Sequence, residues 1–470
     1  MDACRARNKG GAASLSPAGT GIQVAGRGII EESAEFLAAQ GGSRGRPVYI
    51  VDGARTPFLK VRGKPGPFTP VDLAVQCGRP LLDRQDIPRD GFDRVILGCV
   101  NVIADEMNPA RVAALRLGMG ASMVAYTMQI NCGSGMQSID TAFRSIQAGQ
   151  ADLILAGGAE SLSHAPLVFR RDAAAWFGSL RSARGPGARL KALAGFRPWF
   201  MKPVIGLERG LTDPVVELNM GQTAEIIAHL FQVSRDASDA YASESHRRLA
   251  LAQGSGWLDG EIEPAMARDG AAFLADDGVR PDSTSETLAT LKAVFEPPYG
   301  KVTAGNSSQI TDGASWVILA SEEALEKHRL KPRAVIIDSH WSALDPSIMG
   351  LGPTLCATEI MKRHGMGMAD IDLWELNEAF AAQVLACLAA WNDADYCETV
   401  LGLDGRLGRI ERDRLNPDGG AISLGHPVGA SGNRIVLHLV NALHRMDLHR
   451  GIATECIGGG QGGAMMIERI

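Results

Sequence analysis

The sequence has no run approaching the ~20 apolar residues of a membrane-spanning helix. Its first residues also lack the apolar core of a secretory signal. We therefore expect no transmembrane segment and a cytoplasmic location, with an organelle matrix as the alternative. The formal net charge is −6, so the excess of Lys and Arg typical of nucleic-acid-binding proteins is missing as well. We expect no nucleic-acid partner.

Paired cysteines are also missing. The eight cysteines are scattered and none forms a C-x-x-C pair, a pattern typical of free thiols in a reducing compartment. There is no P-loop, no G-x-G-x-x-G after the first expected strand, and no metal-ligand spacing. These absences exclude the commonest nucleotide-cofactor and metal sites.

Aromatic residues make up only 5% of the chain, so the core must be mainly aliphatic. Glycine, by contrast, is abundant and clustered, with 55 residues. Such clusters permit tight turns and close approach of the backbone to a ligand. The 470 residues exceed the ~250–300 at which a single core stops growing, which predicts two or more domains.

The pattern along the chain predicts an α/β fold. Residues 1–46 are rich in Gly, Ala, Ser and Arg and are expected to be a poorly ordered extension, with a targeting segment as the alternative. From Pro47 onward, β-branched and aliphatic runs alternate with a helical pattern at 136–148. The expected strands in this part are 48–51, 95–100, 127–130 and 152–156.

Residues 163–293 break this rhythm with longer helical patterns and are expected to be an inserted lobe. Within it, residues 170–209 carry nine Lys or Arg against two acids, interleaved with aromatic residues. The stretch could bind phosphate, dock a partner, or be only a solvated face. The C-terminal half, from 334–338 to 464–468, repeats the order of strand, helix and Gly cluster, which predicts two similar domains.

Cys132 is the first candidate for chemistry. It lies between an expected strand and an expected helix, flanked by Asn131 and Gly133. The helix N-terminus would lower the pKa of this thiol and favour the nucleophilic thiolate. In the nucleophile elbow of hydrolases, too, the nucleophile lies on a sharp turn between a strand and a helix. A buried structural cysteine is about equally compatible with this setting.

Three further residues lie at similar turns. His426, between Gly425 and Pro427, could act as a general base, although a turn histidine is also compatible. Cys456 ends an expected strand before a glycine run whose N–H groups could stabilise an oxyanion. Asn377 could hold a water or a substrate oxygen, or could cap the following helix.

Together these segments resemble the thiolase family, the 3-ketoacyl-CoA thiolases and acetyl-CoA acetyltransferases, from about residue 47 to the C-terminus. The blocks that carry the resemblance are 51–57, 131–138, 157–161, 304–313, 377–383, 419–432 and 456–462. The resemblance implies a duplicated, layered α/β/α/β/α core. Its expected parts are an N-terminal domain of 47–162 and 294–321, a loop domain of 163–293 and a C-terminal domain of 322–470.

The resemblance also assigns roles. Cys132 matches the acylated nucleophile, His426 its base, and Cys456 the second acid–base thiol. Asn377 matches a residue that positions a water in one oxyanion site, and the N–H groups of Cys132 and Gly458 match the other. Ser308 matches a serine near the coenzyme A arm. The implied reaction is thiolytic cleavage of 3-ketoacyl-CoA, or the reverse Claisen condensation, with coenzyme A as co-substrate and no redox cofactor or metal.

The family implies a homodimer or homotetramer that binds acyl-CoA and coenzyme A. The long segments 163–220 and 383–419 are similar to thiolase subunits of fatty-acid oxidation complexes, which allows a hydratase–dehydrogenase partner. The sequence does not fix acyl chain length or the physiological direction. A ketoacyl synthase would lack the thiol of Cys456. A non-catalytic acyl-CoA- or lipid-binding protein, or a structural subunit on the same fold, is the remaining alternative.

Overall fold

A computed structural model describes residues 45–470, so most of the expected extension at 1–46 lies outside the described residues. Arg46–Ile470 form one compact unit. None of its helices is long and apolar enough to cross a membrane.

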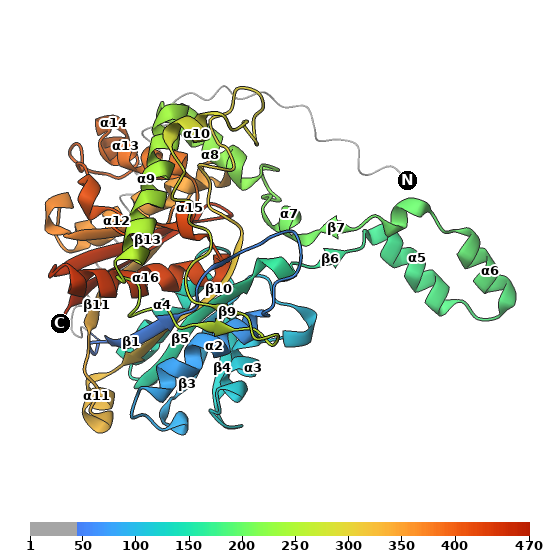
Figure 1. The fold of residues 1–470 in the computed structure, drawn as a ribbon, viewed down its shortest axis with the longest axis horizontal. Helices are drawn as coiled ribbons and strands as arrows, with labels where there is room; N and C mark the ends of the chain where they lie inside the picture. The colour runs from blue at the N-terminus through green and yellow to red at the C-terminus, as the bar shows by residue number, and fades with distance from the viewer. Residues whose placement is uncertain (1–44) are drawn as a thin grey trace, which may run out of the picture. The chain divides into compact units, whose positions relative to one another are not determined.

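The first half of the unit is built on a mixed sheet (Figure 1). Its strands follow the order β4 (Val124–Met128), β3 (Arg94–Gly98), β5 (Leu153–Ser161), β10 (Thr311–Ala320) and β1 (Tyr49–Arg55). The pair β3–β5 is parallel, whereas β10 is antiparallel to both of its neighbours. Every residue of β5 and β10 is buried, as expected of strands covered on both faces.

The second half repeats this arrangement. The order is β12 (Leu373–Leu376), β13 (Arg450–Ile457), β14 (Gln461–Arg469) and β11 (Ala334–Ala343). Here β12 and β13 are parallel and the next two pairs are antiparallel, so β12, β13, β14 and β11 correspond to β3, β5, β10 and β1. The predicted duplication is therefore confirmed. Pairing between β1 and β11 joins the halves through only two residue pairs.

Helices separate the two halves and cover their outer faces. Between the halves lie α4 (Ser134–Gln147) and α16 (Val428–Arg445), which pack on each other and share one apolar cluster. The outer faces are covered by α2 (Pro70–Asp83) in the first half and α12 (Gly352–Arg363) in the second. The predicted α/β/α/β/α layering is therefore confirmed.

The backbones of α4 and α16 approach closely because glycine stands at their contact. A Cβ at Gly135 of α4 would lie 2.7 Å from the backbone nitrogen of Asn433 in α16. A Cβ at Gly158 of β5 would lie 2.1 Å from the carbonyl oxygen of Gly429. Only residues without a side chain fit at these positions, which bring the start of α16 against the start of α4.

The segment between β5 and β10 has two parts. A hairpin of β6 (Leu167–Val168), α5 (Arg171–Ser182), α6 (Pro186–Ala194) and β7 (Val204–Ile205) extends away from the sheet (Figure 1). The following helices, α8 (Met220–Leu230) and α9 (Arg235–Gly254), pack instead on α13 (Ala381–Trp391) and α15 (Ala421–Leu424) of the second half. The boundaries of the predicted loop domain stay a prediction.

The remaining short elements complete the fold. They are β2 (Leu59–Lys60), α3 (Pro109–Arg116), α7 (Gly206–Gly210), β8 (Ala265–Met266), β9 (Ala272–Phe273), α10 (Ser285–Ala289), α11 (Glu322–His328) and α14 (Ala394–Thr399), with 3-10 turns between them.

Candidate active site

Cys132 lies on a sharp turn between β4 and α4. Asn131 has a φ of +47°, in the left-handed region that few residues other than glycine adopt. The Ser134 hydroxyl fixes the turn, accepting from the Ile130 N–H at 2.9 Å and donating to the Asn131 carbonyl at 2.7 Å. The turn places Cys132 two residues before the first residue of α4.

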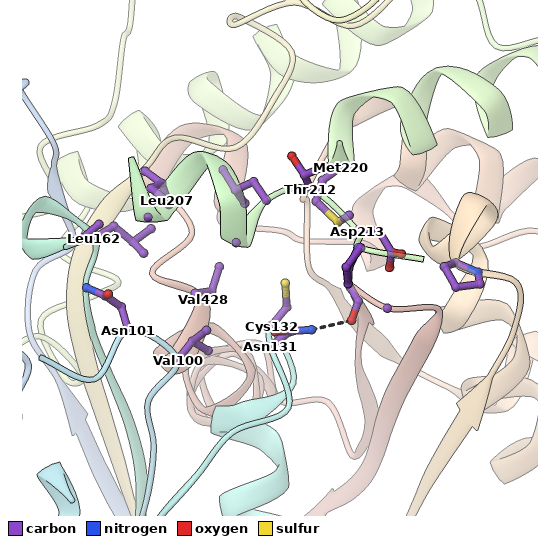
Figure 2. Close-up of a pocket in the computed structure, with 18 of the residues that line it drawn as sticks. Val100, Asn101, Asn131, Cys132, Leu162, Leu207, Thr212, Asp213, Met220 and Val428 are labelled. Carbon is purple, nitrogen blue, oxygen red and sulfur yellow. Dashed lines mark hydrogen bonds between the residues drawn. The ribbon is translucent and has the colours of Figure 1, made fainter. Parts of the chain in front are cut away.

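Cys132 opens onto a cavity of about 420 Å³ (Figure 2). The lining is mostly aliphatic and comes largely from the segment that follows the hairpin. Apolar side chains on it belong to Val100, Leu162, Pro166, Leu207, Leu211, Pro214, Val215, Met220, Pro346 and Val428. In Figure 2 the Cys132 sulfur points into the space between Val428 and Met220. The nucleophile candidate therefore faces a pocket that suits an apolar group.

Gly458, at the turn after β13, lines the same cavity. The Asn131 side-chain amide donates to the Gly458 carbonyl at 2.7 Å, which ties the two turns together (Figure 2). The N–H of Gly458 is placed to hydrogen-bond the Cys132 thiolate and favours it. Residues 327 positions apart thus form one backbone cradle around the sulfur.

The thiol of Cys132 is nevertheless hard to ionise. Burial, and after it the charge of Glu455, raises its pKa to about 12 despite the N–H of Gly458. The prediction that the helix terminus lowers this pKa is therefore wrong for the free protein, because desolvation outweighs the helix dipole. Formation of the thiolate requires a base that removes the proton during the reaction.

Cys456 ends β13 and is 1% exposed. Burial raises its pKa well above the ordinary value, and the nearby Cys132 thiolate is the next largest cause. A thiolate that opposes the ionisation of Cys456 must lie close to it. The backbone agrees, because a Cβ on Gly133, next to Cys132, would lie 2.4 Å from the side chain of Ile457, next to Cys456. The structure therefore brings Cys132, Cys456 and Gly458 into one place.

His426 is buried just before α16 and its ring is fixed on one side. Its Nδ1 lies 2.6 Å from the Ser431 hydroxyl, which lies 3.2 Å from the Pro427 carbonyl. A hydroxyl that donates to the carbonyl accepts from Nδ1–H, which leaves Nε2 as the basic nitrogen. Nε2 is buried without a hydrogen-bond partner among the described residues.

The charge state of His426 also suits a base. Burial, and after it the Arg434 charge, lowers its pKa to about 4, so the ring is neutral at physiological pH. Ser431 was not foreseen from the sequence. Its position one helical turn into α16, five residues after the histidine, is the signal that could have found it.

Asn377 follows β12 and is fully buried. Its backbone N–H donates to Thr454 of β13 at 2.9 Å, whereas neither polar atom of its side chain has a partner in the described part of the chain. The helix-cap alternative is wrong, because α13 begins at Ala381 with Phe380 as its cap. An unpaired buried amide costs about 1–3 kcal/mol, which favours a role with substrate or water.

The other expected residues lie beside this site without a direct contact to Cys132. The Ser308 N–H donates to Ala379 at 2.9 Å, so the 304–313 segment lies against the segment after Asn377. His426 is two residues from the cavity-lining Val428. No hydrogen bond between described residues joins Asn377 or Ser308 to Cys132.

Glu160 was missed by the sequence reasoning. Its buried carboxylate accepts from the backbone N–H groups of Val100, Asn101 and Gly429 at 2.9–3.1 Å. It thereby joins two walls of the cavity. Burial raises its pKa to about 7 although these donors favour its charge. Its place in a glycine-rich strand end gave no sequence signal for this contact.

Comparisons with known proteins agree with this geometry. The chain matches the model of the thiolase N-terminal domain over residues 48–323 and that of the thiolase C-terminal domain over 330–469. It is 39% identical to the beta-ketoadipyl-CoA thiolase of Pseudomonas aeruginosa over 431 residues, covering 90% of this chain and 100% of the relative. It is 35% identical to the mitochondrial trifunctional enzyme subunit beta of Bos taurus, with 90% and 88% covered.

A solved structure, human mitochondrial 3-ketoacyl-CoA thiolase, superposes with a TM-score of 0.78 at 35% identity, covering 91% of this chain and 100% of that one. The chain belongs to the thiolase family. The predictions of the family, of the fold and of an acyltransferase of the thiolase type are confirmed at this level.

Proposed function

We propose that Cys132 is the residue acylated when this thiolase cleaves 3-ketoacyl-CoA, or runs the reverse Claisen condensation. The observation that carries the proposal is the position of Cys132 on an apolar cavity, next to Cys456 and the Gly458 N–H. Covalent catalysis divides one difficult step into two.

Each of the other residues has a role in these steps. His426 Nε2 takes the proton of Cys132, whose high pKa makes a base necessary. The thiolate attacks the 3-keto carbon, the C2–C3 bond breaks, and Cys456 protonates the acetyl-CoA enolate. Cys456 then deprotonates coenzyme A, whose sulfur attacks acyl-Cys132 and releases the shortened acyl-CoA.

Two groups of donors stabilise the developing oxyanions in this scheme. The N–H groups of Cys132 and Gly458 form one, and His426 with a water held by Asn377 forms the other. Each donor contributes on the order of 3 kcal/mol to the transition state. These steps are proton transfers, acyl transfer between thiols and cleavage of one C–C bond, and none of them needs an oxidant or a reductant. We therefore propose that coenzyme A is the co-substrate, near Ser308, and that no metal or redox cofactor takes part.

We propose that the acyl group is an uncharged aliphatic chain. None of the described residues that line the cavity is a Lys, Arg or His. Its acidic residue, Asp213, already accepts from the N–H groups of Val215 and Val216 at 2.8 and 3.1 Å. A terminal carboxylate on the substrate would be desolvated there without a cation to pair with. We therefore expect the relatives named beta-ketoadipyl-CoA thiolase to differ from this chain in the residues that line this cavity.

The assembly and location remain predictions. A homodimer or homotetramer, a hydratase–dehydrogenase partner and a cytoplasmic or matrix location are compatible with a relative that is named as a mitochondrial trifunctional enzyme subunit.

The test is coenzyme A-dependent cleavage of 3-ketoacyl-CoAs of graded length, from acetoacetyl to 3-ketopalmitoyl, with 3-ketoadipyl-CoA in parallel. We expect activity on the aliphatic series, a lower kcat/KM for the dicarboxylic substrate, and no activity in Cys132→Ala. A folded, reduced protein that binds acyl-CoA but cleaves none of these substrates would instead be a non-catalytic acyl-CoA-binding protein.

A further inference from the structure

The backbone around Asn377 is held from several directions. The Asn377 N–H donates to the Thr454 carbonyl of β13 at 2.9 Å, and its carbonyl accepts from the Ala379 N–H at 3.1 Å. The Ala379 carbonyl in turn accepts from the Ser308 N–H at 2.9 Å. The Asn377 side chain, which has no partner among the described residues, therefore projects from a fixed piece of backbone.

Asn416 holds the residue before Asn377. Its side-chain amide accepts from the Leu376 N–H at 2.9 Å and donates to the Leu376 carbonyl at 2.9 Å. The amide thus pairs with Leu376 as the backbone of a neighbouring strand would, at the edge formed by β12. An amide suits this contact because it carries a donor and an acceptor side by side, which a carboxylate does not. Asn416 is 1% exposed, so water cannot take its place.

The same amide also holds the residue after Asn377. Asn416 donates to Oε1 of the Glu378 carboxylate at 3.0 Å, and the Tyr241 hydroxyl donates to the same oxygen at 2.9 Å. The Ser245 hydroxyl donates to Oε2 at 2.7 Å. Glu378 is only 1% exposed, and these donors replace the water that a buried carboxylate loses. Both neighbours of Asn377 are therefore fixed by one side chain, that of Asn416.

The network reaches Asn377 from the segment between β5 and β10. Tyr241 and Ser245 lie one helical turn apart on α9, which packs on the second half. Each side-chain oxygen and nitrogen of Tyr241, Glu378 and Asn416 has a hydrogen-bond partner. A buried network in which all members are paired is rigid, and it leaves no donor that would compete for the Asn377 amide.

We propose that Asn416 is a positioning residue for the enolate step of the reaction: by fixing both neighbours of Asn377, it aims the Asn377 amide at the oxyanion water. Glu378 and Tyr241 complete this support. None of the three lines the cavity, so they act through Asn377 and not on the substrate. The inference rests on the proposed function, which assigns the water to Asn377.

The proposed reaction separates the role of Asn377 from that of Cys132. Transfer of an acyl group between coenzyme A and Cys132 uses the N–H groups of Cys132 and Gly458. Formation of the acetyl-CoA enolate uses His426 and the water held by Asn377. A misdirected Asn377 should therefore slow the enolate step and spare acyl transfer, whereas a general loss of structure would slow both.

Two exchange reactions of acetyl-CoA measure these steps separately. Incorporation of labelled coenzyme A reports acyl transfer, in which the acetyl group moves from the sulfur of coenzyme A to Cys132 and returns to a labelled thiol. Deuterium incorporation into the acetyl methyl group in D2O reports the enolate. There the C–H bond breaks, Cys456 takes the proton, and a deuteron returns to the carbon. Cleavage of acetoacetyl-CoA requires both steps.

Asn416→Gly removes the amide at a φ of +45°, which glycine adopts without strain. We expect deuterium exchange and the kcat of cleavage to fall about 30–100-fold, with exchange of labelled coenzyme A within about twofold of the wild type. Tyr241→Phe removes only one donor to Glu378 and should show the same selectivity with a loss of about 3–10-fold. The matched control Tyr396→Phe removes a hydroxyl 2.8 Å from that of Thr354 and should leave all three rates unchanged.

The rates are compared on protein that circular dichroism shows to be folded, and Tyr241→Phe decides the question if Asn416→Gly does not fold. The inference is overturned if both exchange reactions fall equally, or if deuterium exchange is the same in Tyr241→Phe and Tyr396→Phe. A wild type that exchanges coenzyme A but neither incorporates deuterium nor cleaves acetoacetyl-CoA contradicts the proposed function itself, and with it the role of Asn377.

Discussion

At the scale of single residues, Ser431 sets the orientation and the basic nitrogen of His426 through the 2.6 Å contact with Nδ1. We predict that Ser431→Ala lowers kcat by about 10–100-fold with little change in KM, because Nε2 is then no longer held as the base. Ser145→Ala, which removes a helix hydroxyl bonded to the Thr141 carbonyl, is the matched control. Equal kcat values for the two variants would contradict the role of Ser431.

The pKa values of His426 and Cys132 predict an unusual pH profile for the proposed reaction. His426, with a pKa of about 4, is a competent base above that pH, and Cys132, with a pKa of about 12, keeps its proton until the base removes it. We expect kcat/KM for cleavage to be flat between about pH 5 and pH 9. A steady rise with an apparent pKa near that of an ordinary thiol would mean that the free thiolate is the reacting species.

How far the site could be predicted differs from residue to residue. Cys132, His426 and Cys456 stand at glycine-rich turns, which are visible in the sequence. The alternatives for Asn377 could be separated only in the structure, because its side chain faces no neighbour that a local pattern could reveal. Glu160 could not be foreseen at all, since its contact with Gly429 joins residues 269 positions apart.

At the scale of elements, the contact between α4 and α16 positions Cys132, the proposed nucleophile, relative to His426, its proposed base. Gly135→Ala would place a Cβ 2.7 Å from the Asn433 nitrogen, a backbone atom that cannot move alone. We expect a loss of about 1–3 kcal/mol in the free energy of unfolding and a fall in kcat. In the control Gly178→Ala, in α5, the added Cβ meets nothing within 4 Å. This variant should change neither the free energy of unfolding, measured in urea, nor kcat in the cleavage assay.

β13 carries a buried acid next to Cys456, the proposed second acid–base thiol. Glu455 is fully buried, neither of its oxygens has a hydrogen-bond partner among the described residues, and burial raises its pKa well above the ordinary 4.5. The folded protein therefore keeps a proton that the unfolded chain releases above that pH, so this residue reduces stability as the pH rises.

We predict that Glu455→Gln is more stable than the wild type at neutral pH, and that the difference grows by up to about 1.4 kcal/mol per pH unit above pH 4.5. Urea unfolding at several pH values measures it. A difference that does not change between pH 5 and pH 7 would mean that Glu455 is ionised in the folded protein.

Elements differ in how well the sequence predicts them. The buried strands β5 and β10 have unmistakable aliphatic runs. The expected strand at 127–130 in fact occupies Val124–Met128, because the turn that carries Cys132 already includes Gln129–Asn131. The residues from 129 onward belong to the turn, and the bounds of β4 follow from its pairing with β3, which the sequence pattern does not reveal.

At the scale of the molecule, buried charges join the inserted segment to the core. His438 of α16 lies 2.9 Å from Glu261 and 3.1 Å from Asp418, while Arg55 of β1 lies 2.7 Å from both Glu261 and Asp276. Glu261 and Asp276 belong to the segment between β5 and β10. Burial disfavours the charge of His438, but Glu261 and then Glu375 outweigh it and raise the pKa of His438 to about 10.

The contacts between His438 and its carboxylate partners predict how stability falls at alkaline pH. Because the folded pKa of His438 exceeds the unfolded value of 6.5, its contribution is fully present below pH 6.5 and is lost as the pH rises through 10. We expect the wild type to lose roughly 3–5 kcal/mol over this range. His438→Gln should be less stable at pH 6, with its two carboxylates unpaired, and should lose less between pH 6 and pH 10 in urea unfolding. Equal slopes would contradict the assignment.

The duplication could be predicted from the order of strands, helices and glycine clusters, which recurs along the chain. The packing of α8 and α9 on the second half could not, because a helical pattern shows that a face is buried without naming what covers it. The network of buried charges could not be predicted from the sequence either, because its members come from five separate segments and no local pattern shows which of them meet.

The position of β10 between β1 and β5 has a consequence for synthesis on the ribosome. β1 ends at Arg55 and its central partner begins at Thr311, 256 residues later. At ~5–20 residues per second, the nascent chain waits roughly 13–50 s for the strand that completes its first sheet. The aliphatic edge of β1 is open to wrong pairing throughout that time, and that of β5 from its synthesis onward, so this chain should depend on chaperones while it is being made. Cys132 emerges early, but the Gly458 turn that completes its cradle is among the last residues added.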